Sequence, residues 1–198
     1  MLQSTNNLLI KNWDKINKYC YAVYLGGSRV DSAIDTPHDY DYIWFVKPRQ
    51  YNFLITCLRD IGIKCANVGS NKNKARSDFL IDCSQCRYLP ATKITWFSYL
   101  DPLMQLIAGE DICPKTDIIY KHRKEFIKEL KNKANLISTN RIKNQKRWYH
   151  ILRGIYILLN NSYNVSAEQK RDLNILHDLA SGWEEIKDKT LRLLSNLS

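Results

Sequence analysis

Two apolar runs joined by a polar loop limit the fold more than any other part of the chain. The first run, Tyr21–Leu25, ends at Gly26 and Gly27. The second run, Tyr40–Val46, is rich in aromatic and β-branched residues and ends shortly before Pro48. Short apolar runs bounded by turn residues are typical of buried β-strands. The sequence therefore predicts two strands in one sheet, with a glycine turn where the first strand ends.

The pattern of the remaining chain changes near residue 100. Before it, one helix is expected over the first twenty residues and another at Tyr51–Ile61, and further strands are expected at 63–67, 79–85 and 93–98. After Asp101 no strand is expected: a short helix runs from Pro102 to Gly109, followed by helices at 116–136, 139–160, 166–180 and 183–196. Ser166 and Gln169 form a predicted capping box. The expected class is α+β: a small mixed sheet of about four to five strands with flanking helices, then a C-terminal helical bundle.

Composition excludes several other classes of protein. With 198 residues, 44% of them hydrophobic and 25% charged, the chain has a globular composition, unlike disordered, collagenous or coiled-coil proteins. No apolar run reaches the roughly 18–20 residues that span a bilayer, and the N-terminus lacks the pattern of a signal peptide. We therefore expect a cytoplasmic protein without a membrane partner. Cys83 and Cys86 form a CxxC, but no second ligand pair at metal spacing follows, so a zinc site is not expected.

Most of the excess positive charge lies in one stretch. The net charge is +10, and residues 115–153 contain 12 basic and 3 acidic residues, a net charge of +9. Such a block is typical of a segment that meets nucleic acid or nucleotide phosphates; the alternative is a solvated helix face. Helical spacing places five residues of this stretch along one segment: Lys143, Lys146, Arg147, His150 and Arg153.

The loop between the two predicted strands contains the candidate functional residues. Gly27-Ser28 stands at the end of the first strand, and Asp39-x-Asp41 at the start of the second. Residues two apart in a strand face the same side, so Asp39 and Asp41 are expected to project together. Paired carboxylates need a cation between them, and magnesium prefers oxygen ligands and substrate phosphates. The glycine turn supplies backbone N–H groups for a phosphate, and Ser28 adds a hydroxyl.

These motifs resemble the signature of the DNA polymerase β nucleotidyltransferase superfamily. Within it, the chain is most similar to the small predicted nucleotidyltransferases of bacteria and phages. The segment Trp148–Tyr156 resembles their helix with a Tyr-His-x-x-Arg element. The resemblance covers most of the chain, and it implies a catalytic core at residues 1–112 and a helical domain with a basic face at 113–198.

The resemblance also implies roles for single residues. Gly27 and Ser28 would hold a nucleoside triphosphate such as ATP, and Asp39 and Asp41 would bind two Mg²⁺ (or Mn²⁺) ions. Further contacts to phosphates or the acceptor would come from Arg29, His150 and Arg153. Here Arg29-Val30-Asp31 follows the serine, where members of the superfamily often have small or aromatic residues and glycine.

The superfamily also uses a third carboxylate from a neighbouring strand. Asp82, in Phe-Leu-Ile-Asp-Cys, is the expected residue, and it would be both catalytic and a metal ligand. Asp78 is a less well placed alternative, at the start of that strand. Another alignment puts Lys93 at the position, in which case the third acid is missing.

The predicted activity is magnesium-dependent transfer of a nucleoside monophosphate from an NTP to an acceptor hydroxyl, with release of pyrophosphate. The basic helical half favours an RNA acceptor such as a tRNA 3′ end, contacted by Lys143, Lys146 and Arg147. One alternative is a catalytically inactive member that binds nucleic acid. Another is a transferase that modifies a protein or a small molecule, of toxin or antibiotic-resistance type.

Overall fold

The chain folds into two compact units. A computed structural model describes residues 2–35, 41–66, 80–82, 86–88, 103–112, 122–136, 141–178 and 180–197. The first unit, called here the N-terminal unit, comprises Met1–Asp31 and Pro37–Cys113. The second, called the helical unit, comprises Ser32–Thr36 and Pro114–Ser198. The domain boundary expected from the sequence lies between residues 112 and 113, whereas the N-terminal unit ends at Cys113 and the short segment Ser32–Thr36 belongs to the helical unit.

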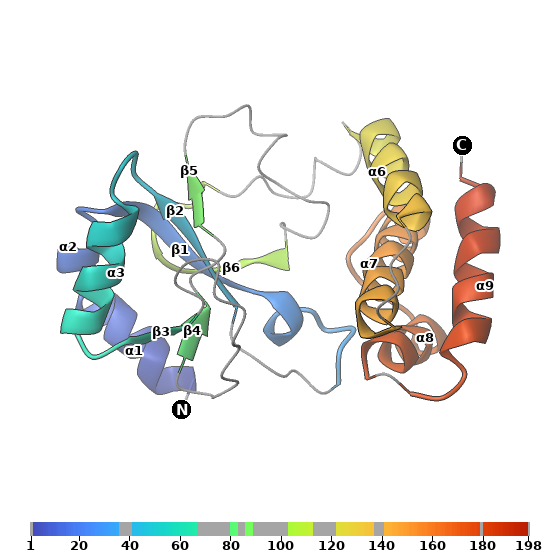
Figure 1. Cartoon of the computed structure of the whole chain (residues 1–198), viewed down its shortest axis with the longest axis horizontal. Coiled ribbons are helices and arrows are strands. Elements are labelled where there is room, and N and C mark those ends of the chain that lie inside the picture. The colour runs from blue at the N-terminus through green and yellow to red at the C-terminus, as the bar shows by residue number, and fades with distance from the viewer. Residues whose placement is uncertain are drawn as a thin grey trace. The chain divides into compact units, whose positions relative to one another are not determined.

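The N-terminal unit is built on a mixed sheet (Figure 1). Its centre is β1 (Cys20–Gly26), which pairs antiparallel with β2 (Asp41–Val46) on one side and with β6 (Gln105–Gly109) on the other. Three shorter strands run parallel to their partners: β3 (Lys64–Ala66), β4 (Leu80–Asp82) and β5 (Cys86–Tyr88). Within the described residues the sheet has six strands in the order β3-β4-β2-β1-β6, with β5 also on β2. Helices and this mixed sheet together confirm the α+β class.

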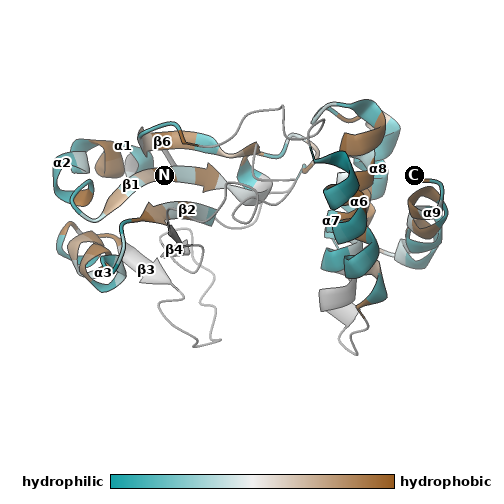
Figure 2. Ribbon diagram, turned by 90° about the horizontal axis from the view of Figure 1, so that it is seen from above, coloured by the Kyte–Doolittle hydropathy of each residue, from teal (hydrophilic) through white to brown (hydrophobic). Residues whose placement is uncertain are grey.

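The two apolar runs form the centre of the sheet because both of their faces are buried. Alternate residues of β1 and β2, among them Val23 and Trp44, pack in one cluster with side chains of three helices. These helices are α1 (Leu2–Lys11), α2 (Trp13–Ile16) and α3 (Tyr51–Asp60). On the other face Tyr24 and Phe45 meet edge to face, with ring centroids 5.6 Å apart. Figure 2 shows the hydrophobic stretches in β1, β2 and β6.

Two expectations for the N-terminal half are wrong. Residues 105–109 form strand β6, where a helix from Pro102 to Gly109 was predicted. The apolar stretch at 106–108 suits either state, and pairing with the edge of β1 decides for the strand. The first twenty residues form two helices, not one, because the chain turns at Asn12. The strands predicted at 63–67 and 79–85 correspond in part to β3 and β4, and the one at 93–98 lies outside the described residues.

The helical unit is organised around one long central helix. α7 (Arg141–Asn160) contacts α6 (Arg123–Asn135), α8 (Ala167–His177) and α9 (Trp183–Ser195). Residues 151–158 of α7 are all buried, as expected for a helix with neighbours on several sides. The capping box predicted at the start of α8 is confirmed: the Ser166 side chain accepts from the Gln169 amide, and the Gln169 side chain accepts from the Ser166 amide. No helix in the described part of the chain has the length and apolar character needed to cross a membrane.

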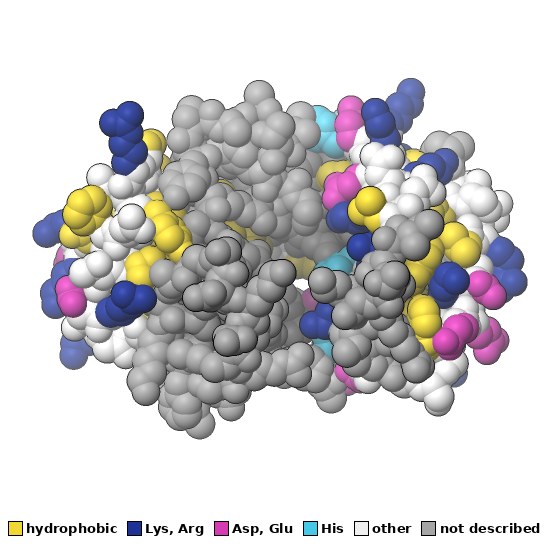
Figure 3. Space-filling model, viewed as in Figure 1, with side chains coloured by type: hydrophobic (Ala, Val, Ile, Leu, Met, Phe, Trp, Pro, Cys, Tyr) yellow, Lys and Arg dark blue, Asp and Glu magenta, His cyan; other side chains and the backbone are white. Residues whose placement is uncertain are grey.

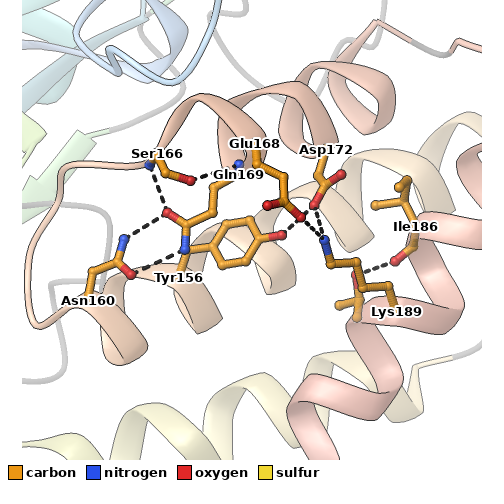
Figure 4. Close-up of polar contacts among 9 residues, drawn as sticks. Tyr156, Asn160, Ser166, Glu168, Gln169, Asp172, Ile186 and Lys189 are labelled. Atoms are coloured by element: carbon orange, nitrogen blue, oxygen red, sulfur yellow. Dashed lines mark hydrogen bonds and ion pairs between the residues drawn. The ribbon is translucent and has the colours of Figure 1, made fainter.

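A polar network with a buried Tyr156–Asp172 hydrogen bond joins α7, α8 and α9 (Figure 4). The Tyr156 hydroxyl and the Lys189 ammonium each donate to Asp172 Oδ2 at 2.7 Å, and Lys189 also donates to Glu168 at 3.2 Å. Burial and the hydrogen bond to Asp172 raise the pKa of the Tyr156 phenol, and the bond to Asp172 raises the pKa of Lys189. Because every group here has a polar partner, the network stabilises the packing of the three helices.

Candidate functional site

The strongest candidate site lies where β1 ends and β2 begins. Gly26 is the register partner of Asp41, and Gly27 starts a short 3₁₀ turn, Gly27–Arg29, closed by a hydrogen bond from the Val30 amide to the Gly27 carbonyl. Gly27 has a φ of +64°, a conformation that glycine adopts far more readily than other residues. The two adjacent glycines of the sequence therefore end the strand as predicted, in a tight turn next to the first residue of β2.

The Asp41 carboxylate lies directly over this turn. A Cβ placed on Gly27 would lie 2.1 Å from Asp41 Oδ2 and 3.0 Å from Asp41 Cγ. Only a residue without a side chain leaves that space, so Gly27 and Asp41 form a matched pair. The Asp41 side chain is half-buried, which keeps the carboxylate at the rim of the sheet and within reach of solvent.

The register of the sheet brings a second aspartate to the same level. Asp41 in β2 is the Cα partner of Asp82 in the parallel strand β4, and Asp82 is in turn the partner of Ala66 in β3. One row across four strands therefore reads Gly26, Asp41, Asp82, Ala66. The backbone thus makes Asp82 the neighbour of Asp41 across the sheet.

Other residues predicted around this row are described only in part. Asp39, Asp78 and Lys93 lie outside the described residues, and for Ser28 and Asp82 only the backbone is described. Arg29 is half-buried at the end of the 3₁₀ turn. Among the side chains that the structure describes, no group of three or more His, Cys, Asp or Glu residues could hold a metal ion.

The loop between the glycine turn and Asp41 contains contacts that the sequence analysis did not predict. Ala33 and Ile34 are buried, and the Asp35 carboxylate accepts a hydrogen bond from Asn174 at 2.8 Å and forms an ion pair with Lys170 at 2.7 Å. The Asp35 amide also donates to Asn174 Oδ1 at 3.2 Å. Helix α8 therefore holds Asp35, which belongs to the helical unit like α8 itself. No local signal in the sequence distinguishes Asp35 from an ordinary solvated loop residue.

The five residues of the predicted basic face do not share one environment. Lys146 and His150 are exposed on α7, and the His150 ring meets the Tyr149 ring at 5.1 Å. Arg147 donates to the Leu136 carbonyl, and the Lys143 side chain lies outside the described part.

Arg153 is fully buried and donates to the Tyr163 carbonyl at 2.7 Å. The predicted phosphate contact requires an accessible guanidinium. The structure gives this side chain a packing role inside the helical unit instead, linking α7 to the turn that follows it. Helical spacing alone could not separate Arg153 from its exposed neighbours, because it does not say which face is covered.

Comparison with known proteins identified no relative of the chain. No protein-family model matches the chain, and no curated protein or solved structure matches it. The row at Gly26, Asp41 and Asp82 and the turn beside it are therefore the features that bear on function.

Proposed function

We propose that the chain is a metal-dependent nucleotidyltransferase that moves a nucleoside monophosphate from an NTP to an acceptor hydroxyl. The observation that carries the proposal is the Asp41 carboxylate, held over Gly27 with Asp82 as its register partner. A glycine turn against a row of carboxylates unites a phosphate-binding element with metal ligands at one sheet edge. The resemblance to the polymerase β superfamily rests on the same residues.

The residues present fit a divalent cation. The space over Gly27 that a side chain would fill is occupied by a half-buried carboxylate, and a second aspartate is its neighbour in the sheet. Carboxylate oxygens are the donors that Mg²⁺ and Mn²⁺ prefer. Asp41, Asp82 and Asp39 would hold the ions. When bound, Mg²⁺ supplies positive charge that neutralises the triphosphate and the attacking oxygen.

The remaining residues of the site act by binding and orienting the nucleotide. The Gly27–Arg29 turn offers backbone N–H groups and the Ser28 hydroxyl to the phosphate oxygens, and Arg29 adds a positive charge. In the reaction the acceptor hydroxyl loses its proton to water, its oxygen bonds to the α-phosphorus, the bond from the α-phosphorus to the pyrophosphate oxygen breaks, and pyrophosphate leaves. Because the protein contributes no covalent step, positioning by these residues accounts for its part of the catalysis.

Charge favours RNA as the acceptor. Residues 115–153 have a net charge of +9, and Lys146 and His150 of this stretch are exposed on α7. A basic surface of this kind binds a polyanion through counterion release, so the affinity for an RNA acceptor should fall with increasing salt. A tRNA 3′ end, with a free hydroxyl on a single strand, is an acceptor of this class.

The test is labelled-nucleotide transfer with a charge-matched control. Wild type, Asp41→Asn and Asp188→Asn are incubated with each α-labelled NTP, Mg²⁺ and total RNA, and products are separated on gels that resolve RNA, protein and small molecules. Asp188 is exposed on α9 and serves as the control. We expect labelled RNA with wild type and Asp188→Asn, and at least about a 100-fold loss with Asp41→Asn.

Three outcomes would change the proposal. Label in a protein or in a small-molecule product would show that this molecule, and not RNA, is the acceptor, and would still support nucleotidyl transfer. Transfer by Asp41→Asn at the wild-type rate would show that Asp41 is not part of the catalytic site. RNA binding without metal-dependent transfer of any nucleotide would favour an inactive member that binds nucleic acid.

A further inference from the structure

A second surface of the N-terminal unit has features of a ligand site. A hollow of about 290 Å³ lies beside α2 and α3, lined by Lys15, Lys18, Tyr19, Phe53, Thr56, Cys57, Asp60 and Ile61. None of these residues belongs to the row at Asp41. Figure 3 shows hydrophobic side chains interspersed with Lys and Arg on the described surface of this unit.

An exposed aromatic pair forms one wall of the hollow. The rings of Tyr19 and Phe53 are nearly parallel, with an interplanar angle of 13° and centroids 6.3 Å apart. Phe53 remains 59% exposed, although it is a large apolar side chain. Tyr19 packs against the core of the unit, whereas Phe53 is absent from that cluster. The stack therefore presents an accessible ring on a support that the core holds in place.

Positive charge borders the aromatic pair. Lys15 and Lys18 line the hollow and are exposed, and both act electrostatically on the Cys57 thiol of α3. Asp60 is the acidic residue among the lining side chains. An accessible aromatic ring beside two lysines matches the two parts of a nucleotide, a flat base and an anionic phosphate.

The surface is separated from the candidate active site by the length of a strand. Tyr19 immediately precedes β1, and the Lys47 amide after β2 donates to the Tyr19 carbonyl at 2.9 Å. Gly26 and Asp41 lie at the opposite ends of these two strands. Since β1 has seven residues, the separation is roughly 20 Å.

We propose that this surface binds single-stranded nucleic acid, with a base stacked on Phe53 and adjacent phosphates beside Lys15 and Lys18. A polyanion suits the lysines, and a single strand suits the ring, because only unpaired bases offer a face for stacking. A duplex would meet the same lysines without using Phe53. The proposal does not rest on the transferase activity, since binding requires neither NTP nor metal.

The test measures binding with EDTA present and no NTP. Fluorescence anisotropy reports the affinity of wild type, Phe53→Ala and Ile10→Ala for a labelled 12-nucleotide oligouridylate and for a 12-base-pair RNA duplex. Ile10 is a matched control, 54% exposed on α1 and outside the hollow. Phe53→Ala should weaken binding of the single strand by about 5- to 100-fold, whereas Ile10→Ala should leave it unchanged.

A second readout locates the bound strand, because the basic helical unit also attracts RNA. Cys57 lines the hollow and is half-buried, so its alkylation by iodoacetamide, followed by peptide mass spectrometry, reports access to this surface. Saturating oligouridylate should slow alkylation of Cys57 several-fold in wild type and not in Phe53→Ala. Urea unfolding midpoints should be equal for the three proteins.

The outcomes separate the alternatives. Wild-type affinity in Phe53→Ala together with unprotected Cys57 would overturn the proposal and leave the hollow as a gap between two helices. Equal affinity for single strand and duplex, both insensitive to Phe53, would also overturn it, because binding would then be by charge alone. If Asp41→Asn loses transfer but still binds the single strand, the proposed binding surface is supported independently of the proposed active site.

Discussion

Replacing Gly27 with alanine tests whether the Asp41 carboxylate lies over the glycine turn. Gly27 has a φ of +64°, where an L-residue costs about 1–2 kcal/mol. The added Cβ would also lie 2.1 Å from Asp41 Oδ2, so the carboxylate or the turn must move by more than about 1 Å to reach a normal contact of about 3.5 Å. Forced displacement of this kind costs about 1–3 kcal/mol. Gly27→Ala should therefore destabilise the protein by about 2–5 kcal/mol.

Gly62 provides a control for the backbone part of this loss. It has a φ of +85°, and a Cβ placed there meets nothing within 4 Å. Gly62→Ala should therefore cost only the conformational strain, about 1–2 kcal/mol. The difference between the two substitutions measures the collision with Asp41.

The assay is urea unfolding followed by tryptophan fluorescence and circular dichroism. Both glycine variants are made in the wild-type chain and in Asp41→Ala, which removes Oδ2 and Cγ and leaves Cβ at 3.2 Å. The extra cost of Gly27→Ala should then shrink by about 1 kcal/mol or more, the coupling expected for residues in contact. Equal m-values are needed for the comparison, because a changed slope would indicate a changed unfolding transition.

One result would refute the reasoning. If Gly27→Ala and Gly62→Ala cost the same in both backgrounds, the carboxylate does not lie over Gly27. The turn proposed to bind phosphate and the proposed metal ligand would then be separate features, and the proposed site would lose the observation that carries it.

Three further predictions concern the helical unit. Tyr156→Phe removes the buried hydrogen bond to Asp172 and should lower the free energy of unfolding by about 1–2 kcal/mol in urea titrations, with unchanged circular dichroism. Because the pKa of Lys189 is raised above 10.5, the stability difference between wild type and Lys189→Met should be constant between about pH 7 and pH 10 and shrink as the pH rises further; growth above pH 10.5 would contradict this. Asp35→Ala removes exposed contacts to Asn174, so it should cost less than about 1 kcal/mol but speed hydrogen exchange at residues 32–35; unchanged exchange would argue against anchoring.

Predictions that rested on local signals agree best with the structure. The apolar run at 21–25 and the glycines after it lie in β1 and the turn, and the capping box at Ser166 and Gln169 starts α8. Each of these signals acts within a few residues, through strand burial, backbone freedom or a side chain bonding to a nearby amide. The sequence spacing between Gly27 and Asp41 likewise pointed to the turn and the strand start that the structure pairs.

Predictions that depended on distant partners were less complete. Residues 105–109 form a strand because β1 has an edge to pair with, and their own sequence does not record that edge. Arg153 fits the spacing of a basic face, yet α7 turns it into the interior of the helical unit. The sequence predicts Asp35 to be an ordinary loop residue, whereas the structure shows it bonded to Asn174 and Lys170 of α8.

The sequence by itself determined the α+β class, the glycine turn and the choice of the aspartates proposed as cation ligands, since these follow from composition and from patterns within short segments. The tertiary structure decided which residues stand together. It made Asp82 the neighbour of Asp41, placed that carboxylate over Gly27, and brought Tyr19 and Phe53 into one stack. The physical reason is that strand register and helix packing are set by contacts between residues far apart in the chain, and no short segment contains them.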